Sequence, residues 1–389
     1  MAEAVIVEAV RTARGKRKGS LAGTHPMDLL AHVLKALFRR TGVDPLEVED
    51  VGIGCVTQIG EQGMNIARGA VLAAGLPIEL AGKTINRFCG SGLEAVNEAA
   101  MQIMSGMADI AIGGGVEHMT RVPMGADVLN DQAGEGPASP ALMERFSLVP
   151  QGISAELIAA QWKLSRRQLD EFSALSQARA ANAIEKGYFK KEIEPIVVKG
   201  ADGVERLFDR DEHPRPGTTA DTLAALKPSF KEGGVIHAGN SSGIVDGAAA
   251  VMLMSKAKAR SLGLKPRAKI VSMAVAGSDP VLMLTGPIPS TQKALSRADL
   301  TMKDIDLVEI NEAFAPVPLA CGRELGFDFD KVNVNGGAIA LGHPLGATGA
   351  ILVGTLLNEL ERRDQRRGLV TMCIGYGMGI TTIIDRKVD

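Results

Sequence analysis

Cys89 stands where a predicted strand gives way to a predicted helix. It lies in the stretch NRFCGSGLEAV (86–96), after a predicted strand over 82–89 and beside glycines that leave the backbone open to another molecule. Free amide groups and the positive end of a helix dipole both favour a thiolate at such a position. An inert buried thiol is the alternative for Cys89 taken alone. The stretch nevertheless marks a candidate nucleophile.

A histidine occupies a similar setting in the last quarter of the chain. His343 lies in NGGAIALGHPLGATGA (335–350), directly before a predicted helix rich in small residues. The segment falls near the counterpart of the Cys89 turn in an internal repeat of the chain. Two helix N-termini from related halves could thus bring a thiol and an imidazole together, and a Cys–His pair is a recognised way to activate a nucleophile. A structural capping histidine is the alternative.

Two more strand ends carry polar or reactive groups. Cys373 ends a buried run in TMCIGYGMG (371–379), where the glycines that follow expose amide N–H groups able to stabilise an oxyanion. Asn311 and Glu312 stand in VEINEAFAP (308–316), where a strand would otherwise stay apolar. Reactive groups at several equivalent places of one fold weaken the purely structural interpretation of each.

The elements that would position these groups alternate between strands and helices. Apolar runs predict strands at 4–10, 50–56, 108–115 and 248–255. Helical periodicity, with a glycine at its end, predicts a helix over 25–42. This alternation is typical of βαβ units and of mostly parallel, buried sheets, so the fold class is α/β.

The C-terminal third repeats the plan of the N-terminal third. Residues 34–56 align with 292–314, and 105–115 align with 365–377 at a similar offset. We therefore infer two related α/β halves. The expected domains are a first half over 1–117 with 241–265, an insert over 118–240, and a second half over 266–389.

The insert differs in character from both halves. It contains a polar loop over 129–140 and a long helix over 165–187, for which Ser165 and Gln168 form a plausible capping box. A loose polar insert between two tight α/β halves is a usual place for a lid or a binding surface.

Composition excludes several classes of protein. The 389 residues suffice for two or three packed units, and 43 basic against 45 acidic residues leave a formal net charge of −2, without the basic excess of a nucleic-acid-binding protein. No apolar run is long enough to span a bilayer, and the N-terminus has no export signal. We expect the protein to reside in the cytoplasm or in an equivalent reducing compartment.

The four cysteines are scattered without C-x-x-C spacing. Their spacing does not suit a disulfide framework or a zinc site, so we expect no metal. A cysteine with a function in this chain is then expected to act as a reactive thiol.

Five stretches, in order along the chain, together resemble the thiolase family. They are NRFCGSGLEAV, AGNSSGIVDGAAAV (238–251), EINEAFA, NVNGGAIALGHPLGATGA and MCIGYGMG. The resemblance covers essentially the whole chain, including VRTARGKRKGSLAG (10–23), where Ala13 replaces the family's usual proline. It implies a five-layered αβαβα fold of two duplicated halves, with an inserted loop domain that covers coenzyme A.

The resemblance also implies roles for individual residues. Cys89 would be the nucleophile that carries the acyl group, and His343 would take its proton and help to bind an oxyanion. Cys373 would be a second acid and base. Asn311 would hold a water in the first oxyanion hole, while the backbone amides of Cys89 and Gly375 would form the second.

The implied reaction is thiolytic cleavage of a 3-oxoacyl-CoA to acetyl-CoA and a shortened acyl-CoA, or the reverse Claisen condensation. CoA is then a substrate, and no permanently bound cofactor is expected. Ser242 in GNSSG and Arg215 in PRPG match positions that contact CoA, although Arg215 also suits a solvated loop. We interpret the basic clusters at 14–18 and 361–367 as solvated segments.

Two other classes remain as alternatives. Decarboxylating or initiating condensing enzymes of this fold pair the cysteine with two histidines, or with histidine and asparagine, and lack a second cysteine, so Cys373 argues against them. A catalytically silent acyl-CoA or lipid binder is opposed by the intact set of Cys89, His343, Asn311 and Cys373.

Substrate range and assembly follow from smaller signals. Pro150 and Gln151 stand where acetoacetyl-CoA-specific members often carry His-Met-Gly, which favours a degradative enzyme of fatty-acid, aromatic or steroid side-chain breakdown over an acetoacetyl-CoA-forming one. The resemblance further implies a homodimer, or a homotetramer through 118–125. Strand edges such as 105–115 would be covered at a two-fold interface.

Overall fold

A computed structural model describes residues 2–128, 137–200 and 202–388; most of the predicted polar loop 129–140 lies outside these ranges. In the described part, the strands of the first half are hydrogen-bonded in one continuous order. That order is β1 (Ala4–Arg11), β8 (Val245–Ser255), β5 (Ile110–His118), β3 (Asp50–Gly54) and β4 (Ala81–Ile85). A short strand, β2 (Gly15–Lys16), adds to β8.

The second half repeats this order. Its strands are β9 (Ala268–Gly277), β12 (Met378–Asp385), β11 (Arg367–Ile374) and β10 (Leu307–Ile310). The first strand of each half pairs antiparallel with the last strand, which in turn pairs antiparallel with the strand before it. The two halves meet where β1 pairs antiparallel with β9. The internal repeat inferred from the sequence is confirmed.

The expectation of mostly parallel sheets is wrong. Among the strands named above, parallel pairs are β3 with β4, β3 with β5, and β10 with β11, whereas the pairs at the centre are antiparallel. The error has a physical cause: β8 and β5 are buried along their whole length. Antiparallel strands that are buried on both faces lose the polar–apolar alternation, so their sequences are continuously apolar, as those of parallel strands are.

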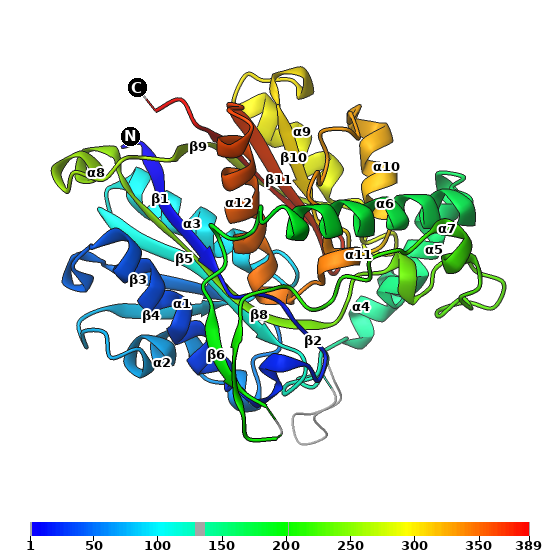
Figure 1. The fold of residues 1–389 in the computed structure, drawn as a ribbon. Helices are drawn as coiled ribbons and strands as arrows, with labels where there is room; N and C mark the ends of the chain where they lie inside the picture. Colours follow the sequence, from blue (N-terminus) through cyan, green and yellow to red (C-terminus); the bar gives the residue numbers. More distant parts are fainter. Residues whose placement is uncertain (1, 129–136, 201, 389) are drawn as a thin grey trace.

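The helices form three layers, and the strands of the two halves form two layers between them, so the fold has five layers (Figure 1). Helices α1 (Pro26–Thr41) and α2 (Ile66–Ala73) cover the outer side of the first half. Helices α9 (Pro287–Arg297) and α10 (Pro316–Leu325) cover the outer side of the second. Helices α3 (Ser91–Ser105) and α12 (Leu345–Arg362) pack on each other between them.

Glycines allow α3 and α12 to touch backbone to backbone. A Cβ atom on Gly92 would lie 2.5 Å from the carbonyl oxygen of Gly346, and one on Gly349 would lie 2.1 Å from the amide nitrogen of Leu93. Any larger residue at either position would push the helices apart. This contact sets the separation of the two helix N-termini.

Capping residues explain where two predicted helices begin and end. The ring of His25 accepts a hydrogen bond from the Met27 amide at the start of α1, and Gly42 ends that helix in a left-handed conformation with φ of 68°. Helix α6 (Arg166–Glu185) begins with the capping box of Ser165 and Gln168. Both helices were predicted from the sequence, and both are confirmed.

The remaining elements are short. They are α4 (Pro140–Arg145), α5 (Gln151–Gln161), β6 (Ile196–Lys199), β7 (Glu205–Phe208), α7 (Ala220–Ala224), α8 (Lys256–Ser261), α11 (Ala338–Leu341) and the 3-10 helices Ser20–Gly23, Pro45–Glu47, Gly60–Gln62, Ala238–Asn240 and Met302–Asp304. The two-stranded sheet of β6 and β7 was not predicted. No helix in the described ranges is both long and apolar enough to cross a membrane.

A buried ion-pair network ties the segment after α6 to the first half. The guanidinium of Arg11, on β1, contacts Glu192 at 2.6 Å and binds both carboxylate oxygens of Asp211 at 2.7 and 2.9 Å. It also lies over the ring of Phe189, 5.2 Å from the centroid. Removing one partner of such a buried pair leaves uncompensated charge in the interior.

We predict that Arg11→Met lowers the free energy of unfolding by about 3–5 kcal/mol, because two buried carboxylates lose their cation. Arg39→Met is the matched control: the Arg39 side chain is 59% exposed and pairs with Glu194, so its loss should cost no more than about 1 kcal/mol. Urea denaturation followed by circular dichroism measures both. Equal stability of the two variants would contradict a role for the network.

Candidate active site

Cys89 lies on a turn rather than at the end of a strand. The strand predicted over 82–89 ends at Ile85, because side chains take over the hydrogen bonds of the following residues. The Asn86 carboxamide accepts from the Phe88 amide, and the Ser91 hydroxyl accepts from the Arg87 amide. Phe88 is thereby held at a positive φ of 46°. Cys89 follows directly, before the first turn of α3.

The thiol of Cys89 is 6% exposed and packs among Val56, Met119 and Leu345. Burial raises its pKa to about 11, while hydrogen bonds from its own amide, from Gln151 and from the Gly375 amide work in the opposite direction. From its place at a helix N-terminus we expected a more acidic thiol, and this expectation is wrong because the pKa is raised. The loss of water around the sulfur raises the pKa by more than the surrounding hydrogen-bond donors lower it.

A second turn faces the Cys89 turn from the other half of the molecule. It joins β11 to β12 and contains Gly375 and Tyr376. The ring of Tyr376 meets the ring of Phe88 edge to face at 5.5 Å, and a Cβ atom on Gly90 would lie 2.6 Å from the Ile374 side chain. The two turns therefore touch, which brings the Gly375 amide to the sulfur of Cys89.

Cys373 is the next-to-last residue of β11 and is fully buried. Burial raises the pKa of its thiol well above the ordinary value, and the charge of Cys89 acts in the same direction. The two sulfurs are thus coupled electrostatically: a thiolate at Cys89 makes a thiolate at Cys373 less favourable. This arrangement keeps a proton on Cys373 while Cys89 carries negative charge.

His343 and Asn311 form a second polar pair. The Asn311 amide lies 3.3 Å from Nε2 of His343, and Nδ1 of His343 lies 2.6 Å from the Thr348 hydroxyl. The Thr348 hydroxyl donates to the Pro344 carbonyl, so it accepts from Nδ1–H, which leaves the lone pair on Nε2. Burial, with a smaller effect from Arg14, lowers the pKa of His343 to about 3. The imidazole is therefore neutral, with an unprotonated Nε2.

Asn311 has a further unused group. Its Oδ1 atom is buried and has no hydrogen-bond partner among the described residues. The residue directly follows β10, as the sequence predicted.

The helix N-termini of α3 and α12 converge, as the internal repeat suggested. Leu345, the first residue of α12, packs against Cys89, and His343 lies two residues earlier in the chain. The carboxylate of Glu117 accepts hydrogen bonds from the amides of Val56 and Gly346 at 2.9 Å each. Glu117 thus fixes the start of α12 against the first half.

A cavity of about 990 Å³ opens beside this cluster. Ser242 and Arg215, the predicted CoA contacts, both line it. Gly243 also lines it, and the Gly243 carbonyl accepts a hydrogen bond from the His343 amide at 3.0 Å. Its wall also includes Lys16, Arg17, His213, Phe230 and Ile339.

The basic cluster 14–18 is not simply a solvated segment. Arg14 is 3% exposed, so its side chain belongs to the interior. Lys16 and Arg17 are exposed, but both line the 990 Å³ cavity together with Arg215. Three cationic side chains at one cavity suit an anionic, phosphate-bearing ligand.

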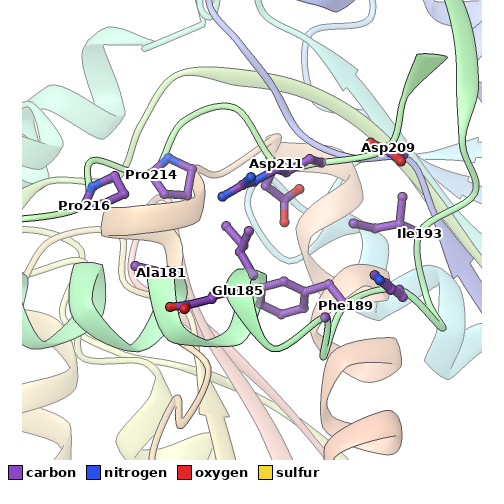
Figure 2. A pocket seen from close by; sticks show the side chains of 12 residues that line it. Ala181, Glu185, Phe189, Ile193, Asp209, Asp211, Pro214 and Pro216 are labelled. Carbon is purple, nitrogen blue, oxygen red and sulfur yellow. The ribbon is translucent and has the colours of Figure 1, made fainter.

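A second cavity, of about 700 Å³, lies against the end of α6 (Figure 2). Its wall includes Phe189, Asp211 and Pro214, and Pro214 also lines the larger cavity. None of the predicted site residues borders it.

Among the described residues no three His, Cys, Asp or Glu side chains are grouped so as to hold a metal ion. All four cysteines are free and buried.

Sequence reasoning missed several residues of the site. Gln151 was noted only for its bearing on substrate length, yet its side chain is among the groups that lower the pKa of Cys89 against the effect of burial. Glu117 carried a usable signal, because a glutamate at the end of the buried strand over 108–115 requires hydrogen-bond donors. The positions of Lys16 and Arg17 beside Arg215 depend on contacts between distant segments.

Comparisons with known proteins agree with this geometry. Residues 4–257 match the family model for the thiolase N-terminal domain, and 264–386 match that for the thiolase C-terminal domain. The chain is 48% identical to a 3-ketoacyl-CoA thiolase of Vibrio cholerae, with 98% of this chain and 99% of the relative covered. It is 46% identical to an acetyl-CoA acetyltransferase of Pseudomonas aeruginosa, with 99% and 100% covered.

A solved structure resembles the whole molecule. The acetyl-CoA acetyltransferase of Bacillus anthracis superposes with a TM-score of 0.91 at 41% sequence identity, and 99% of each chain is covered. With both family models matched over nearly the full length, the chain belongs to the thiolase family of acyltransferases.

Proposed function

We propose that the protein cleaves 3-oxoacyl-CoA with free CoA, yielding acetyl-CoA and a shortened acyl-CoA through an acyl group carried on Cys89. One observation carries the proposal: the turn with Cys89 contacts the turn with Gly375 from the other half, and Cys89 packs against Leu345, two residues after His343. The Vibrio cholerae relative is named a 3-ketoacyl-CoA thiolase, which supports the substrate class.

In the first half-reaction the Cys89 thiol gives its proton to Nε2 of His343, and the sulfur attacks the ketone carbon. The resulting oxyanion needs donors, which protonated His343 and a water held by Oδ1 of Asn311 supply. The bond between carbons 2 and 3 then breaks, and its electron pair forms the enolate of acetyl-CoA. Cys373 protonates that enolate, since burial keeps its thiol protonated up to this step.

In the second half-reaction the Cys373 thiolate takes the proton of an incoming CoA thiol. The CoA sulfur attacks the acyl-Cys89 thioester, and the amides of Cys89 and Gly375 stabilise the new oxyanion. Cys89 leaves as a thiolate and recovers its proton from His343. The same steps in reverse form a carbon–carbon bond.

CoA would enter through the 990 Å³ cavity as a substrate. We assign its phosphates to Arg215, Lys16 and Arg17, and its thiol end to the region of Ser242 and Gly243, next to His343. The insert over 118–240, between halves over 1–117 with 241–265 and over 266–389, would cover the bound CoA. Since Cys89 and Cys373 act as thiols, a reducing compartment such as the cytoplasm suits the enzyme.

We predict that the two cysteine variants differ in kind. Cys89→Ala should abolish the acyl-enzyme, because no other group is positioned to hold the acyl chain. Cys373→Ala should still be acylated slowly by acetyl-CoA, but should lose carbon–carbon cleavage by roughly 10²–10⁴-fold, the usual contribution of a positioned acid or base. Intact-protein mass spectrometry after incubation with acetyl-CoA distinguishes them.

Cys321→Ala serves as the matched control, since Cys321 is a buried thiol on α10 with no part in the steps above. An acetyl adduct that persists in Cys89→Ala, or that maps to Cys373 in the wild type, would overturn the assigned roles.

We predict that substrates longer than acetoacetyl-CoA are cleaved, because Pro150 and Gln151 replace the short-chain histidine motif. Steady-state rates across a chain-length series, followed by loss of 3-oxoacyl-CoA absorbance, measure this. A collapse of kcat/KM beyond four carbons would instead favour an acetoacetyl-CoA-forming acetyltransferase, the name carried by the Pseudomonas aeruginosa relative. No cleavage of any chain length would favour an acyl-CoA binder.

The strand at the edge of the sheet is not the one that the sequence suggested for the dimer interface. Strand β5, in the 105–115 region, lies between β8 and β3 and is not an edge. The first half ends at β4, which is flanked by the exposed Met64 (99%) and Ile78 (74%). We propose that β4 pairs with a second copy of the chain, and that 118–125 would serve any tetramer.

Light scattering at micromolar concentration should give at least the mass of a dimer. Met64→Glu should weaken the dimer, whereas Val197→Glu, an equally drastic change at a 60% exposed position on β6, should not. A stable wild-type monomer would refute the proposal.

A further inference from the structure

A tight turn carries two of the three cationic side chains at the CoA cavity. Its first residue, Lys16, ends β2, and the Gly19 amide donates a hydrogen bond to the Lys16 carbonyl at 2.8 Å. Arg17 and Lys18 therefore form the tip of the turn. Lys16 and Arg17 line the cavity together with Arg215. The conformation of the tip thus decides where one of the positive charges lies.

The backbone at this tip is strained. Lys18 has a positive φ of 58°, a left-handed conformation that residues other than glycine seldom adopt. Such a conformation persists only where the surrounding structure holds it. Contacts to the Lys18 backbone must therefore maintain the turn.

The hydroxyl of Thr120 provides such a contact. It accepts a hydrogen bond from the Lys18 amide at 2.9 Å and donates one to Oδ2 of Asp246 at 2.6 Å. The Thr120 amide donates to Oδ1 of the same carboxylate at 2.9 Å. The hydroxyl thus directs its single proton to Asp246 and offers a lone pair to the turn.

The carboxylate behind Thr120 is itself fixed. Asp246, on β8, is fully buried, and its Oδ1 atom lies 3.3 Å from Nδ1 of His118, which is also fully buried. Nε2 of His118 lies 3.0 Å from the Leu21 carbonyl, which follows the turn in the chain. Because a carbonyl oxygen only accepts, Nε2 is the donor in this contact. Thr120 therefore holds Lys18 from a rigid, buried support.

The base of the turn is held by a different group. The carboxylate of Glu212 accepts from the Lys16 amide at 3.0 Å and from the Ser20 amide and hydroxyl at 3.1 and 2.8 Å. Glu212 also lines the cavity, so its charge offsets part of the positive charge there. Since these contacts secure the base, the hydrogen bond to Thr120 acts on the tip.

We propose that Thr120 is a positioning residue for CoA: its hydroxyl holds the Lys18 amide so that Arg17 faces the phosphates of the bound substrate. The proposal rests on the function proposed above. Without the hydroxyl, Lys18 relaxes to a negative φ and the peptide between Arg17 and Lys18 changes its orientation. Arg17 then leaves the cavity wall, and the phosphates lose one cationic partner.

The test compares CoA with pantetheine, which has the same thiol but no phosphate, as acyl acceptors at saturating 3-oxoacyl-CoA. Thr120→Val keeps the shape of the side chain and removes the hydroxyl. It should raise the KM for CoA roughly three- to tenfold, the equilibrium equivalent of one hydrogen bond, and leave the KM for pantetheine unchanged. Thr120→Ser, which keeps the hydroxyl, should retain the wild-type values. Isothermal titration calorimetry with CoA alone measures the same change without turnover.

Thr41→Val is the matched control. The Thr41 hydroxyl, at the end of α1, also donates to a carbonyl, that of Leu37 at 2.8 Å, and accepts from an amide, that of Val43 at 3.4 Å. Its loss should change neither KM value.

A second pair of variants tests the same hydrogen bond from the exposed turn, should Thr120→Val fail to fold. Lys18→Pro removes the amide donor and forbids a positive φ, whereas Lys18→Gly keeps the donor and permits that φ. Both remove the lysine charge. Lys18→Pro should therefore bind CoA more weakly than Lys18→Gly, and equal affinities would overturn the proposal.

A double-mutant cycle identifies the cation that Thr120 positions. If Thr120 acts through Arg17, adding Thr120→Val to Arg17→Met causes no further loss of CoA affinity. Additive losses would show that Thr120 acts on another group. An unchanged KM for CoA in Thr120→Val, or an equal rise in the KM values for CoA and pantetheine, would likewise overturn the proposal.

Calorimetry separates this proposal from the proposed function, because it needs no reaction. Weaker CoA binding by Thr120→Val in a protein that cleaves no 3-oxoacyl-CoA supports the role of Thr120 and refutes the reaction. Normal thiolysis with the same CoA affinity in wild type and Thr120→Val supports the reaction and refutes the role of Thr120.

Discussion

The carboxylate of Glu117 is the constraint on which the reactive cluster depends. It is fully buried, and it accepts hydrogen bonds from the amides of Val56, Thr57 and Gly346 and from the side chain of Gln62. Leaving such a group without partners is costly, so both halves must supply donors at one point. The loop that contacts Cys89 and the helix that follows His343 are thereby joined through one side chain.

A second buried carboxylate does the same for helix α6. Glu312 accepts hydrogen bonds from the Ser176 hydroxyl on α6, from the Asn333 amide and from the Ile339 amide. It adjoins Asn311, so the contact that holds α6 also steadies the partner of His343. Each half thus contributes one anchored glutamate, and the reactive groups lie between the two anchors. Burial raises the pKa of both carboxyls, which is the energetic cost of this arrangement.

Sequence reasoning succeeded where chemistry is local. The positions of Cys373 and Asn311 beside strand ends and the capping of α6 depend on residues near in the chain, and the structure agrees with each. It failed where burial by residues distant in the chain determines strand direction or the pKa of a side chain. Periodicity cannot distinguish antiparallel from parallel strands once both faces are covered, and a helix dipole does not reveal that Cys89 loses its water. The position of Lys16 and Arg17 beside Arg215 required the fold itself.

The glycine contact between α3 and α12 has a consequence for how such an enzyme can diversify. Because Gly92 and Gly349 each meet the backbone of the opposite helix, every side chain is excluded from that junction. A side chain there would separate the two turns that carry the reactive groups. The cavity wall does not share this restriction, because residues such as Phe230 and Arg215 line it from segments outside α3 and α12. The shape of the cavity can therefore be altered without disturbing the helix contact on which the reactive groups depend.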